Sequence, residues 1–398
     1  MSDSDAISGH TDRASRRDGT RVASGRRLGW WLAGVGIVGL VAATVSHPSQ
    51  ARSAAAQDWS PFVLVAGLLL IGVVADDDGL FAAAGHRLAR MARNGPLLFL
   101  GAALMVGIVT AVLNLDTSVA FVTPVLVYTA RSRGEGEEPL LYGALLLANA
   151  GSLFLPGSNL TNLIVLGHLH LSGGQFLAHM WAPALAALIV TAAVVATFEH
   201  RSLRAKGGEL THVDRAAVGL GLVAVATATV LVVVLSSPAL PVAAVGVMAI
   251  GVRLATGKDN VRHVAGVLSL PVLLGLFGVA VALGTLGRVW SGPATLLSHL
   301  DSGGTAAFAA IASVALNNLP AASLLAARTP SHPFSLLIGL NLGPNLFVTG
   351  SLAWLLWLQA ARSAGAEPSI AKASRLGLVA VPLSMAAALG LLALTGSG

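Results

Sequence analysis

The sequence has no cysteine among its 398 residues, and only 11% of its residues are charged. The first absence excludes disulfides, thiolate metal sites and any cysteine-based capture of a soft metal or metalloid. The second separates the chain from soluble domains, in which roughly 25% of residues are charged. Mean hydropathy is +0.78, and apolar blocks near or above the ~20 residues that span a bilayer recur throughout. The composition predicts an all-α polytopic membrane protein, because lipid offers backbone groups no partners, whereas a β-barrel would show short alternating segments.

Several functional motifs are also missing. The P-loop pattern Gly-x-x-x-x-Gly-Lys-[Ser/Thr] does not occur, so the chain alone is not an ATP-driven pump. Neither His-Glu-x-x-His, Gly-x-Ser-x-Gly nor a cofactor motif occurs. We therefore expect no enzyme, no cofactor and no metal site.

The basic residues carry information about topology. The formal charge is +6 and the isoelectric point is about 10.7, yet the Lys and Arg residues lie in short loops between apolar blocks, so no nucleic-acid partner is expected. With the N-terminus placed inside, only Arg52, Arg288 and Arg328 of the 24 Lys and Arg residues remain outside. This asymmetry follows the positive-inside rule and predicts a multi-pass inner (plasma) membrane protein with a cytoplasmic N-terminus.

The apolar blocks also suggest how the chain is organised. We expect a disordered cytoplasmic tail (1–28), a first transmembrane helix with an outer loop (29–60), a first repeat (61–198), a cytoplasmic loop (199–215) and a second half (216–398). Each half contains a block split by a short polar stretch, "NLDT" in 97–130 and "NNLP" in 305–327. We interpret both as re-entrant hairpins, which enter and leave on the same side of the membrane.

A long interrupted helix follows each hairpin, at 140–165 and 334–358. Both carry Asn-x-Gly and then Gly-Ser, namely Asn149, Gly151, Gly157 and Ser158 in the first and Asn341, Gly343, Gly350 and Ser351 in the second. Two such halves inserted with opposite orientation form the inverted-repeat plan of secondary transporters.

The interruptions are suited to binding a solute. Pro156 and Pro344 each free a backbone carbonyl, glycines let a ligand approach the backbone, and Asn, Ser and Thr side chains supply donors and acceptors. A gap at mid-membrane costs several kcal/mol per unsatisfied group unless it is buried or watered. The alternative is close helix packing through small residues with a tolerated proline kink.

Asp116 is the only acidic residue between Met91 and Arg131, and it lies on the tip of the first hairpin. A carboxylate at this place is typical of ion or proton handling, so we expect Asp116 to couple transport to protons. The alternative is an N-cap, with Asp116 or Thr117 satisfying the free amides of the second hairpin arm.

Two other features have ordinary interpretations. Trp30, Trp31, Trp354 and Trp357 are typical of anchors at the membrane–water interface. The acidic run "ADDDGLF" at 75–81 is typical of a solvated membrane face.

The chain resembles the arsenite permease (arsenical pump membrane protein) family of the ion-transporter superfamily, which includes the sodium–dicarboxylate symporters. The resemblance rests on "LNLGPNLFVTGSLAWLLWL", "ANAGSLFLPGSNLTNLIV", "LNNLPAASL" and "GLLLIGVVADDDGLF", and covers about residues 60 to 395. The first hairpin tip departs from the family's usual Asn-Asp-Gly-Ala-Ala, because the acid comes one place later and Thr replaces Gly. The symporters' Ser-Asn-Thr signature is absent from both tips.

The resemblance implies a substrate site between the hairpin tips and the broken helices, a homodimer, and in some members a separate ATPase subunit. It implies proton-driven export of arsenite or antimonite. The alternatives are a sodium- or proton-coupled carboxylate or inorganic-anion transporter, a sodium/proton antiporter, and a membrane scaffold or enzyme subunit. The expected site residues are Asn114, Asp116, Thr117, Asn149, Ser158, Asn159, Asn317, Asn318, Asn341, Asn345, Thr349 and Ser351.

Overall fold

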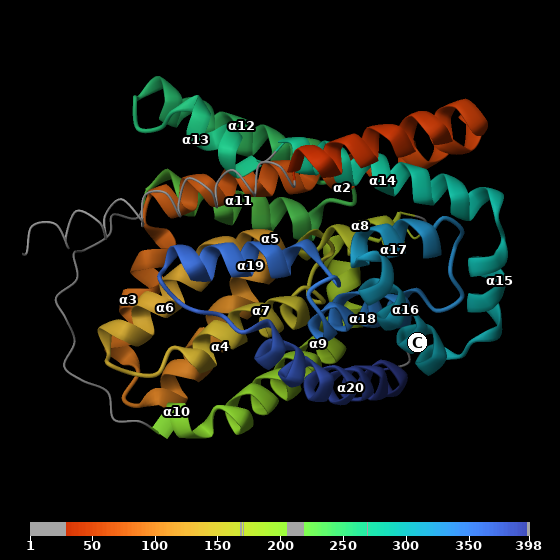
Figure 1. Ribbon diagram of the computed structural model, residues 1–398. Helices are drawn as coiled ribbons and strands as arrows, with labels where there is room; N and C mark the ends of the chain where they lie inside the picture. The colour runs from red at the N-terminus through yellow and green to blue at the C-terminus, as the bar shows by residue number, and fades with distance from the viewer. Residues whose placement is uncertain (1–28, 168, 170, 205–218, 269, 396–398) are drawn as a thin grey trace, which may run out of the picture.

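The computed structural model describes residues 29–167, 169, 171–204, 219–268 and 270–395. The expected tail at 1–28 and most of the expected loop at 199–215 lie outside these residues. Within them, all regular structure is helical. Figure 1 shows an outer layer of long helices lying over an inner group of shorter, interrupted ones.

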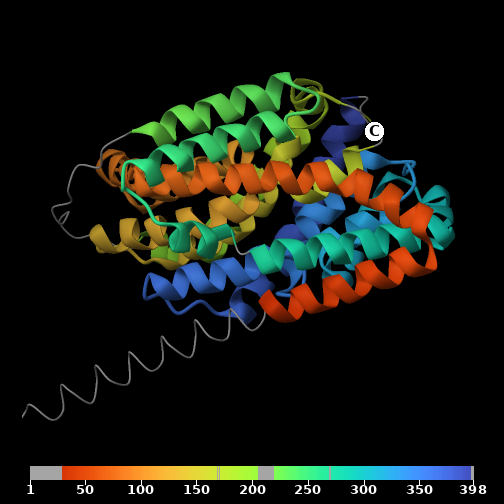
Figure 2. The same ribbon diagram turned by 90° about the horizontal axis from the view of Figure 1, so that it is seen from above.

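The outer layer is built around α2 (Pro48–Asp77). It contains a first helix, Gly29–Ser46, with α11 (Leu220–Val234), α12 (Ala239–Ala255), α13 (Val261–Leu268), α14 (Leu270–Val289) and α15 (Gly292–His299). Figure 2 shows α11 and α12 on one side of α2 and α14 with the first helix on the other. Small residues permit this packing, because a Cβ added at Gly67 of α2 would lie 2.7 Å from Cα of Ala243 in α12.

α2 is longer than the sequence analysis expected. The predicted outer loop before residue 61 is helical from Pro48, which occupies the first helical position and suits it because a proline there loses no intrahelical bond. The following "ARSAAAQ" is rich in strong helix formers. The helical stretch therefore has 30 residues.

The first inner segment leaves α3 (Leu80–Met91) and turns back on itself. It comprises α4 (Gly95–Val112), α5 (Leu115–Thr117), the π-helix η1 (Ser118–Val122) and α6 (Thr123–Ser132). Both of its ends lie against α10 (His200–Arg204), since a Cβ on Gly95 would overlap the backbone of Leu203 and one on Gly136 would lie 3.1 Å from Ser202. The chain thus reverses direction near Asn114, between α4 and α5.

The second inner segment reverses at Asn317. α16 (Ser302–Leu316) and α17 (Asn318–Leu325) pack on each other, and Asn317 between them has a φ of +77°. A non-glycine residue with positive φ is uncommon, and Asn is among the types that adopt it most often. The reversal is fixed further by hydrogen bonds to the second broken helix, described below.

Two interrupted helices lie at the centre of the molecule. The first is α7 (Glu138–Gly151), the 3₁₀ turn η2 (Pro156–Ser158) and α8 (Leu160–Leu166), and the second is α18 (Pro333–Leu342), η3 (Gly343–Leu346) and α19 (Leu352–Ser363). α9 (Gly173–Phe198) and α20 (Ile370–Leu394) pack against each other beneath them in the view of Figure 1. Each of the two interrupted helices breaks at a stretch that contains glycine, proline, Ser and Asn.

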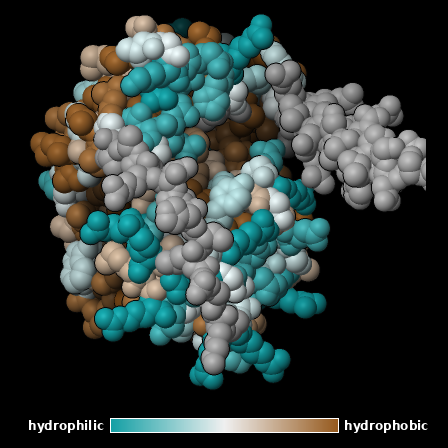
Figure 3. Space-filling view, turned by 90° about the vertical axis from the view of Figure 1, so that its left-hand side faces the viewer, coloured by the Kyte–Doolittle hydropathy of each residue, from teal (hydrophilic) through white to brown (hydrophobic). Residues whose placement is uncertain are grey.

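The length and hydropathy of the helices identify the segments that can span a membrane. Within the described part of the chain, six helical stretches can span a bilayer: Gly29–Ser46, Pro48–Asp77, Gly95–Val112, Gly173–Phe198, Val261–Val289 and Ile370–Leu394. α3, α10 and α13 lie at the left-hand end of Figure 1, and Figure 3 shows many hydrophilic residues on that end. The protein is therefore a multi-pass membrane protein whose polar end is formed by these short helices.

Of the four tryptophans predicted to be interfacial anchors, two are not. Trp30 and Trp31 are exposed, as expected, but Trp354 and Trp357 are fully buried. Trp354 Nε1 donates to the carbonyl of Pro344 (2.7 Å) and Trp357 Nε1 to that of Leu141 (2.8 Å). An indole buried with its N–H paired contributes a large apolar surface to packing, so here both rings hold the second broken helix in place.

Candidate functional site

The two broken helices cross at their interruptions, and Asn341 holds the crossing together. Its Oδ1 accepts hydrogen bonds from Ser152 Oγ (2.5 Å) and Asn159 Nδ2 (2.7 Å). Its Nδ2 donates to Asn162 Oδ1 (2.8 Å) and to the Leu337 carbonyl (2.8 Å). An amide offers two donors and two acceptor lone pairs, so Asn341 has no capacity left for a ligand.

A second amide pair lies one turn away. Asn149 Nδ2 donates to Asn345 Oδ1 (2.9 Å), and Asn345 Nδ2 donates to the carbonyl of Leu146 (3.1 Å). Both side chains are fully buried, but Asn149 Oδ1 accepts no hydrogen bond from any residue the structure describes. Leaving a buried acceptor unpaired costs about 1–3 kcal/mol, which marks this oxygen as a place for a ligand.

The tip of the second hairpin is bonded to the loop that ends the second interruption. The backbone amide of Asn318 donates to the Gly350 carbonyl (2.8 Å), and Asn317 Nδ2 donates to the Thr349 carbonyl (3.2 Å). Thr349 Oγ1 donates back to the carbonyl of Val314 (2.7 Å). These bonds join the α16–α17 reversal to residues 349–350 as one unit.

The tip of the first hairpin is less completely bonded. Asn114 is the N-cap of α5, where its Oδ1 accepts from the Thr117 amide (2.7 Å). The alternative role of Asp116 or Thr117 as the cap is therefore wrong, because Asn114 occupies that position. The half-buried Asp116 carboxylate has no hydrogen bond or ion pair to any residue within the described ranges.

Unpaired polar atoms gather around this first tip. The π-helix η1 follows it, and π-helical turns occur often at functional sites. Among the residues described, buried side-chain atoms lacking a hydrogen-bond partner include Thr110 Oγ1, Asn114 Nδ2, Thr117 Oγ1, Ser118 Oγ, Thr123 Oγ1 and Ser351 Oγ. Native interiors leave few such groups unpaired, so a concentration of them indicates a site for a bound solute or ion.

The loop 347–351 lies between the two tips. Residues 349 and 350 bond the second tip, while Ser351 begins α19, which contacts α5 at the first tip. The far end of α19 is fixed to the end of α6, because Arg131 donates to the carbonyls of Ala364 (2.7 Å) and Gly365 (2.9 Å). α19 therefore lies along η1 and α6, and its N-terminus, with partial positive charge, faces the first tip.

The central region contains few charged side chains. The sequence has no Lys or Arg in 134–200, 289–327 or 329–361, which contain the second hairpin and both broken helices up to the last turn of α19, where Arg362 stands. Asp116 is the one carboxylate on either hairpin tip. The chemistry available is thus amide, hydroxyl and carbonyl dipoles with a single titratable acid.

The expected site residues fall into two groups: those whose polar side-chain atoms have hydrogen-bond partners, and those with unpaired atoms. Asn159 and Asn341 bond each other, and Ser158 donates to the Ser152 carbonyl, so these residues shape the crossing. Asn345, Asn317, Asn318 and Thr349 also have partners. Side-chain atoms without a hydrogen-bond partner in the described residues remain on Asn114, Asp116, Thr117, Asn149 and Ser351.

Sequence reasoning missed Ser152 and Asn162, which bond to Asn341 across the crossing. It also missed Thr110, Ser118 and Thr123, whose hydroxyls are unpaired. Their position in the sequence could have indicated Ser152 and Asn162, because both lie close to residues of the predicted interruption: Ser152 follows Gly151, and Asn162 comes three residues after Asn159.

Comparisons with known proteins identify the family of this chain. The pattern that defines the citrate transporter family matches residues 22–358. An arsenical pump membrane protein of Escherichia coli is 24% identical over 362 residues (82% of this chain, 84% of that protein), and one of Yersinia enterocolitica is 25% identical over 338 residues (75% and 78%). The inner membrane protein YbiR of Escherichia coli K12 is 28% identical over 137 residues, 34% of this chain and 37% of its own.

A solved structure is also similar. The YdaH transporter of Alcanivorax borkumensis, described as having an unusual topology, aligns with a TM-score of 0.48 at 16% identity, over 83% of this chain and 84% of that chain. The resemblance to the arsenite permease family is confirmed by the two arsenical pump relatives, which match most of both chains. Since the family pattern covers well over half of the sequence, the chain belongs to the citrate transporter family of membrane transporters.

Proposed function

We propose that this protein is a secondary active transporter that exports arsenite and antimonite, as As(OH)3 and Sb(OH)3, in exchange for inward-moving protons. The observation that carries the proposal is the set of unpaired amide and hydroxyl atoms on the first hairpin and the broken helices, where Asp116 is the one carboxylate on either hairpin tip. The arsenical pump relatives support this choice of substrate.

The chemistry of the centre favours a neutral cargo. As(OH)3 presents three hydroxyls, which can donate to Asn149 Oδ1 and accept from Asn114 Nδ2, both of which are unpaired. A multiply charged carboxylate would require compensation, because an unpaired buried charge is costly. The absence of Lys and Arg from both interruptions and from the second hairpin offers a trianion no such compensation.

Asp116 is the proposed proton carrier. It stands beside unpaired hydroxyls and has no fixed partner in the described part of the chain, so it can take up and release a proton without breaking an ion pair. One proton moving down 100 mV supplies about 2.3 kcal/mol, which supports roughly a 50-fold gradient of a neutral solute. Proton influx through Asp116 can therefore drive export against a substantial gradient.

The transport cycle follows from the two kinds of contact. The crossing at Asn341, where that side chain is fully hydrogen-bonded, is the proposed fixed point. The tips at 114–117 and 317–318 belong to the proposed first repeat (61–198) and second half (216–398), which are taken to be inverted relative to each other. Largely rigid displacement of the hairpin-containing unit would expose the site to each side in turn. The proposed orientation has the N-terminus in the cytoplasm, the proposed assembly is a homodimer, and the proposed further partner is an ATPase subunit.

Growth of an arsenite-sensitive host tests the proposal. A pump-deleted strain that expresses this chain should grow at arsenite and antimonite concentrations that stop the parent, and the Asp116→Asn strain should not. Unchanged sensitivity, with the protein present in the membrane, would overturn the metalloid assignment.

A second candidate is cation-coupled carboxylate transport, which the name of the family favours. It predicts sodium- or proton-dependent uptake of citrate by proteoliposomes containing the purified chain. A sodium/proton antiporter on the same fold instead predicts acidification of everted vesicles when sodium is added. The proposed exporter should show neither response.

A further inference from the structure

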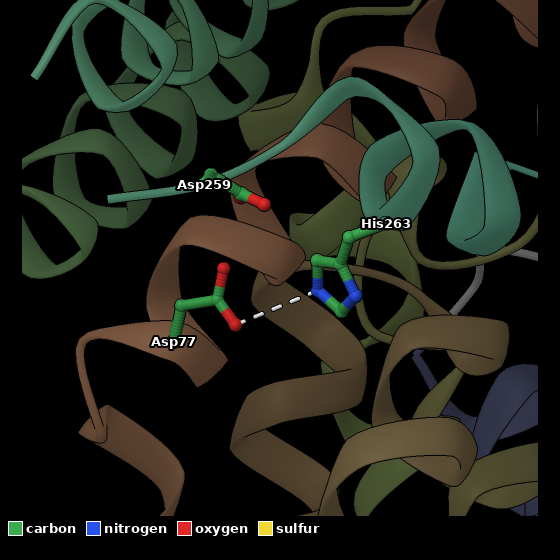
Figure 4. A group of neighbouring side chains, drawn as sticks. All are labelled: Asp77, Asp259 and His263. Carbon is green, nitrogen blue, oxygen red and sulfur yellow. Dashed lines mark ion pairs between the residues drawn. The ribbon is translucent and has the colours of Figure 1, made fainter. Parts of the chain in front are cut away.

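A separate cluster of charged side chains lies where α2 ends, away from the central site. The turn after α12 builds it: Gly257 has a φ of +67°, and the amide of Lys258 bonds back to the carbonyl of Arg253 (2.9 Å). This turn directs Asp259 back toward the end of α2. Asn260 then caps α13 by accepting from the His263 amide (2.9 Å), which places His263 on the same side. Figure 4 shows Asp77, Asp259 and His263 around a common space.

The acidic run at the end of α2 is not simply solvated, as the sequence suggested. Asp78 Oδ1 pairs with Arg253 Nη1 (2.5 Å), and Asp78 Oδ2 accepts from the backbone amide of Gly221 (2.7 Å), the second residue of α11. Arg253 itself is buried. Asp78 thus ties together α2, α11 and α12, and the Arg253 guanidinium is one positive charge among the three carboxylates of Asp77, Asp78 and Asp259.

The remaining carboxylates are left with excess negative charge. Asp77 Oδ2 lies 3.3 Å from Arg253 Nη2, but its Oδ1 faces His263 Nε2 at 3.6 Å. The Asp259 side chain is only 3% exposed, yet its Oδ2 makes no hydrogen bond to the described residues, and its distance to Arg253 Nε is 3.8 Å. A buried carboxylate oxygen without a hydrogen bond is costly, so this atom calls for a cation.

We propose that Asp77, Asp259 and His263 form a binding site for a divalent transition-metal ion such as Zn²⁺. Oxygen and imidazole nitrogen atoms from the three side chains all lie within 4.8 Å of one another. Ligands bound to zinc at about 2.0–2.2 Å stand about 3.3–3.6 Å apart in a tetrahedron, close to the 3.6 Å between Asp77 Oδ1 and His263 Nε2.

The ligand set also decides the class of metal. Imidazole favours zinc and its neighbours over Mg²⁺ and Ca²⁺, which prefer oxygen ligands alone. Two carboxylates balance the charge of a divalent ion, and water would complete the coordination. Of the nearby cations, Lys258 and Arg262 are exposed, where water screens their charge, and the buried Arg253 is paired with Asp78 at 2.5 Å. A bound ion would fasten the start of α13 to the end of α2, at the same end of the molecule as α3 and α10.

Zinc titration of the purified full-length chain in lipid nanodiscs tests this inference independently of transport. We expect ZnCl2 to slow amide hydrogen exchange in residues 257–266, and the binding isotherm to lose one site in both His263→Ala and Asp259→Asn. His200→Ala is the matched control, because His200 is exposed and lies outside the cluster. It should retain the full number of sites and the protection.

MgCl2 at the same concentration should produce at least tenfold weaker protection. The inference is overturned if zinc leaves exchange in 257–266 unchanged, or if His263→Ala and Asp259→Asn bind zinc like the parent protein. Because the side chain of His263 is 46% exposed, its removal leaves packing intact and separates loss of a ligand from loss of folding.

Discussion

At the scale of single residues, the centre of this transporter contains two populations of polar side chains. Asn341, Asn159 and Asn162 satisfy one another across 182 and 179 positions of sequence, whereas Asn114, Asn149 and Ser351 keep unpaired atoms. The hydrogen bonds of the first group offset the cost of its burial, whereas the unpaired atoms of the second group carry that cost until a ligand supplies a partner. We infer that the first group supports the site and that the second contacts the cargo.

The supporting role of Asn341 predicts a loss of stability. Asn341→Ala leaves Asn159 Nδ2 and Asn162 Oδ1 without this partner, at about 1–3 kcal/mol for each orphaned group. The expected loss is about 2–6 kcal/mol, against about 1 kcal/mol for Asn94→Ala, which removes an exposed N-cap. Denaturant-induced unfolding of the purified variants measures both. Equal losses would show that the crossing does not depend on Asn341.

The coupling role of Asp116 predicts a different defect. Asp116→Asn keeps the size and polarity of the side chain but cannot carry a proton, so uphill arsenite accumulation should fall at least tenfold while downhill movement continues. Asp301→Asn is the control, because Asp301 is an exposed N-cap of α16 and Asn caps equally well. Asp116 has no coupling role if Asp116→Asn still accumulates arsenite in everted vesicles in response to a proton gradient.

At the scale of elements, the second interruption is held by close contact with α20. Gly377 in α20 lies against the backbone of Asn345, and a Cβ added there would overlap the carbonyl oxygen of Asn345. Glycine is needed here because no side chain fits between the two backbones. The position of η3, and with it the Asn149–Asn345 bond, therefore depends on a residue outside both broken helices.

Gly377→Ala should displace η3 and reduce the arsenite transport rate at least tenfold. Gly390→Ala is the matched control in the same helix, since nothing lies within 4 Å of a Cβ added there. The control should transport normally, and it should be slightly more stable because alanine favours a helix by about 1 kcal/mol over glycine. Normal transport by Gly377→Ala would show that the site tolerates movement of η3.

The sequence predicted the interruptions well because their causes are local. Glycine, proline and Asn in "LPGSN" and "GPN" weaken a helix wherever they stand, so the breaks at 152–159 and 343–351 could be located. Ser152 and Asn162 were missed because only their distant partner, Asn341, distinguishes them from other polar residues. Trp354 and Trp357 were misassigned because composition near a segment end cannot show which neighbour covers it. Asp78 was misassigned for the same reason, since Arg253 is 175 positions away.

At the scale of the whole molecule, orientation remains a prediction from the placement of Lys and Arg. The absence of cysteine makes it testable, because any introduced cysteine is the only reactive thiol. Ser298 and Ser363 are both exposed and lie on the proposed outer and cytoplasmic sides, respectively. A membrane-impermeant maleimide should label Ser298→Cys in intact cells, and Ser363→Cys only after permeabilisation. The reverse pattern would place the N-terminus outside.

At the scale of the whole molecule, the chain belongs to a family named for citrate transport, yet the interruptions of its broken helices contain no Lys or Arg that could bind a citrate trianion. We propose that the polar atoms of the broken helices and hairpin tips decide the cargo, rather than the architecture shared with relatives. Unpaired amide and hydroxyl atoms with one carboxylate suit a neutral trihydroxide exchanged for a proton.

Arsenite accumulation by everted membrane vesicles tests this central claim most directly. Vesicles containing the protein, energised to be acidic inside, should accumulate arsenite well above its outside concentration, and a protonophore should abolish the gradient. Citrate added in excess should not compete. Accumulation of citrate instead, or no arsenite accumulation by vesicles that contain the folded protein, would contradict the account.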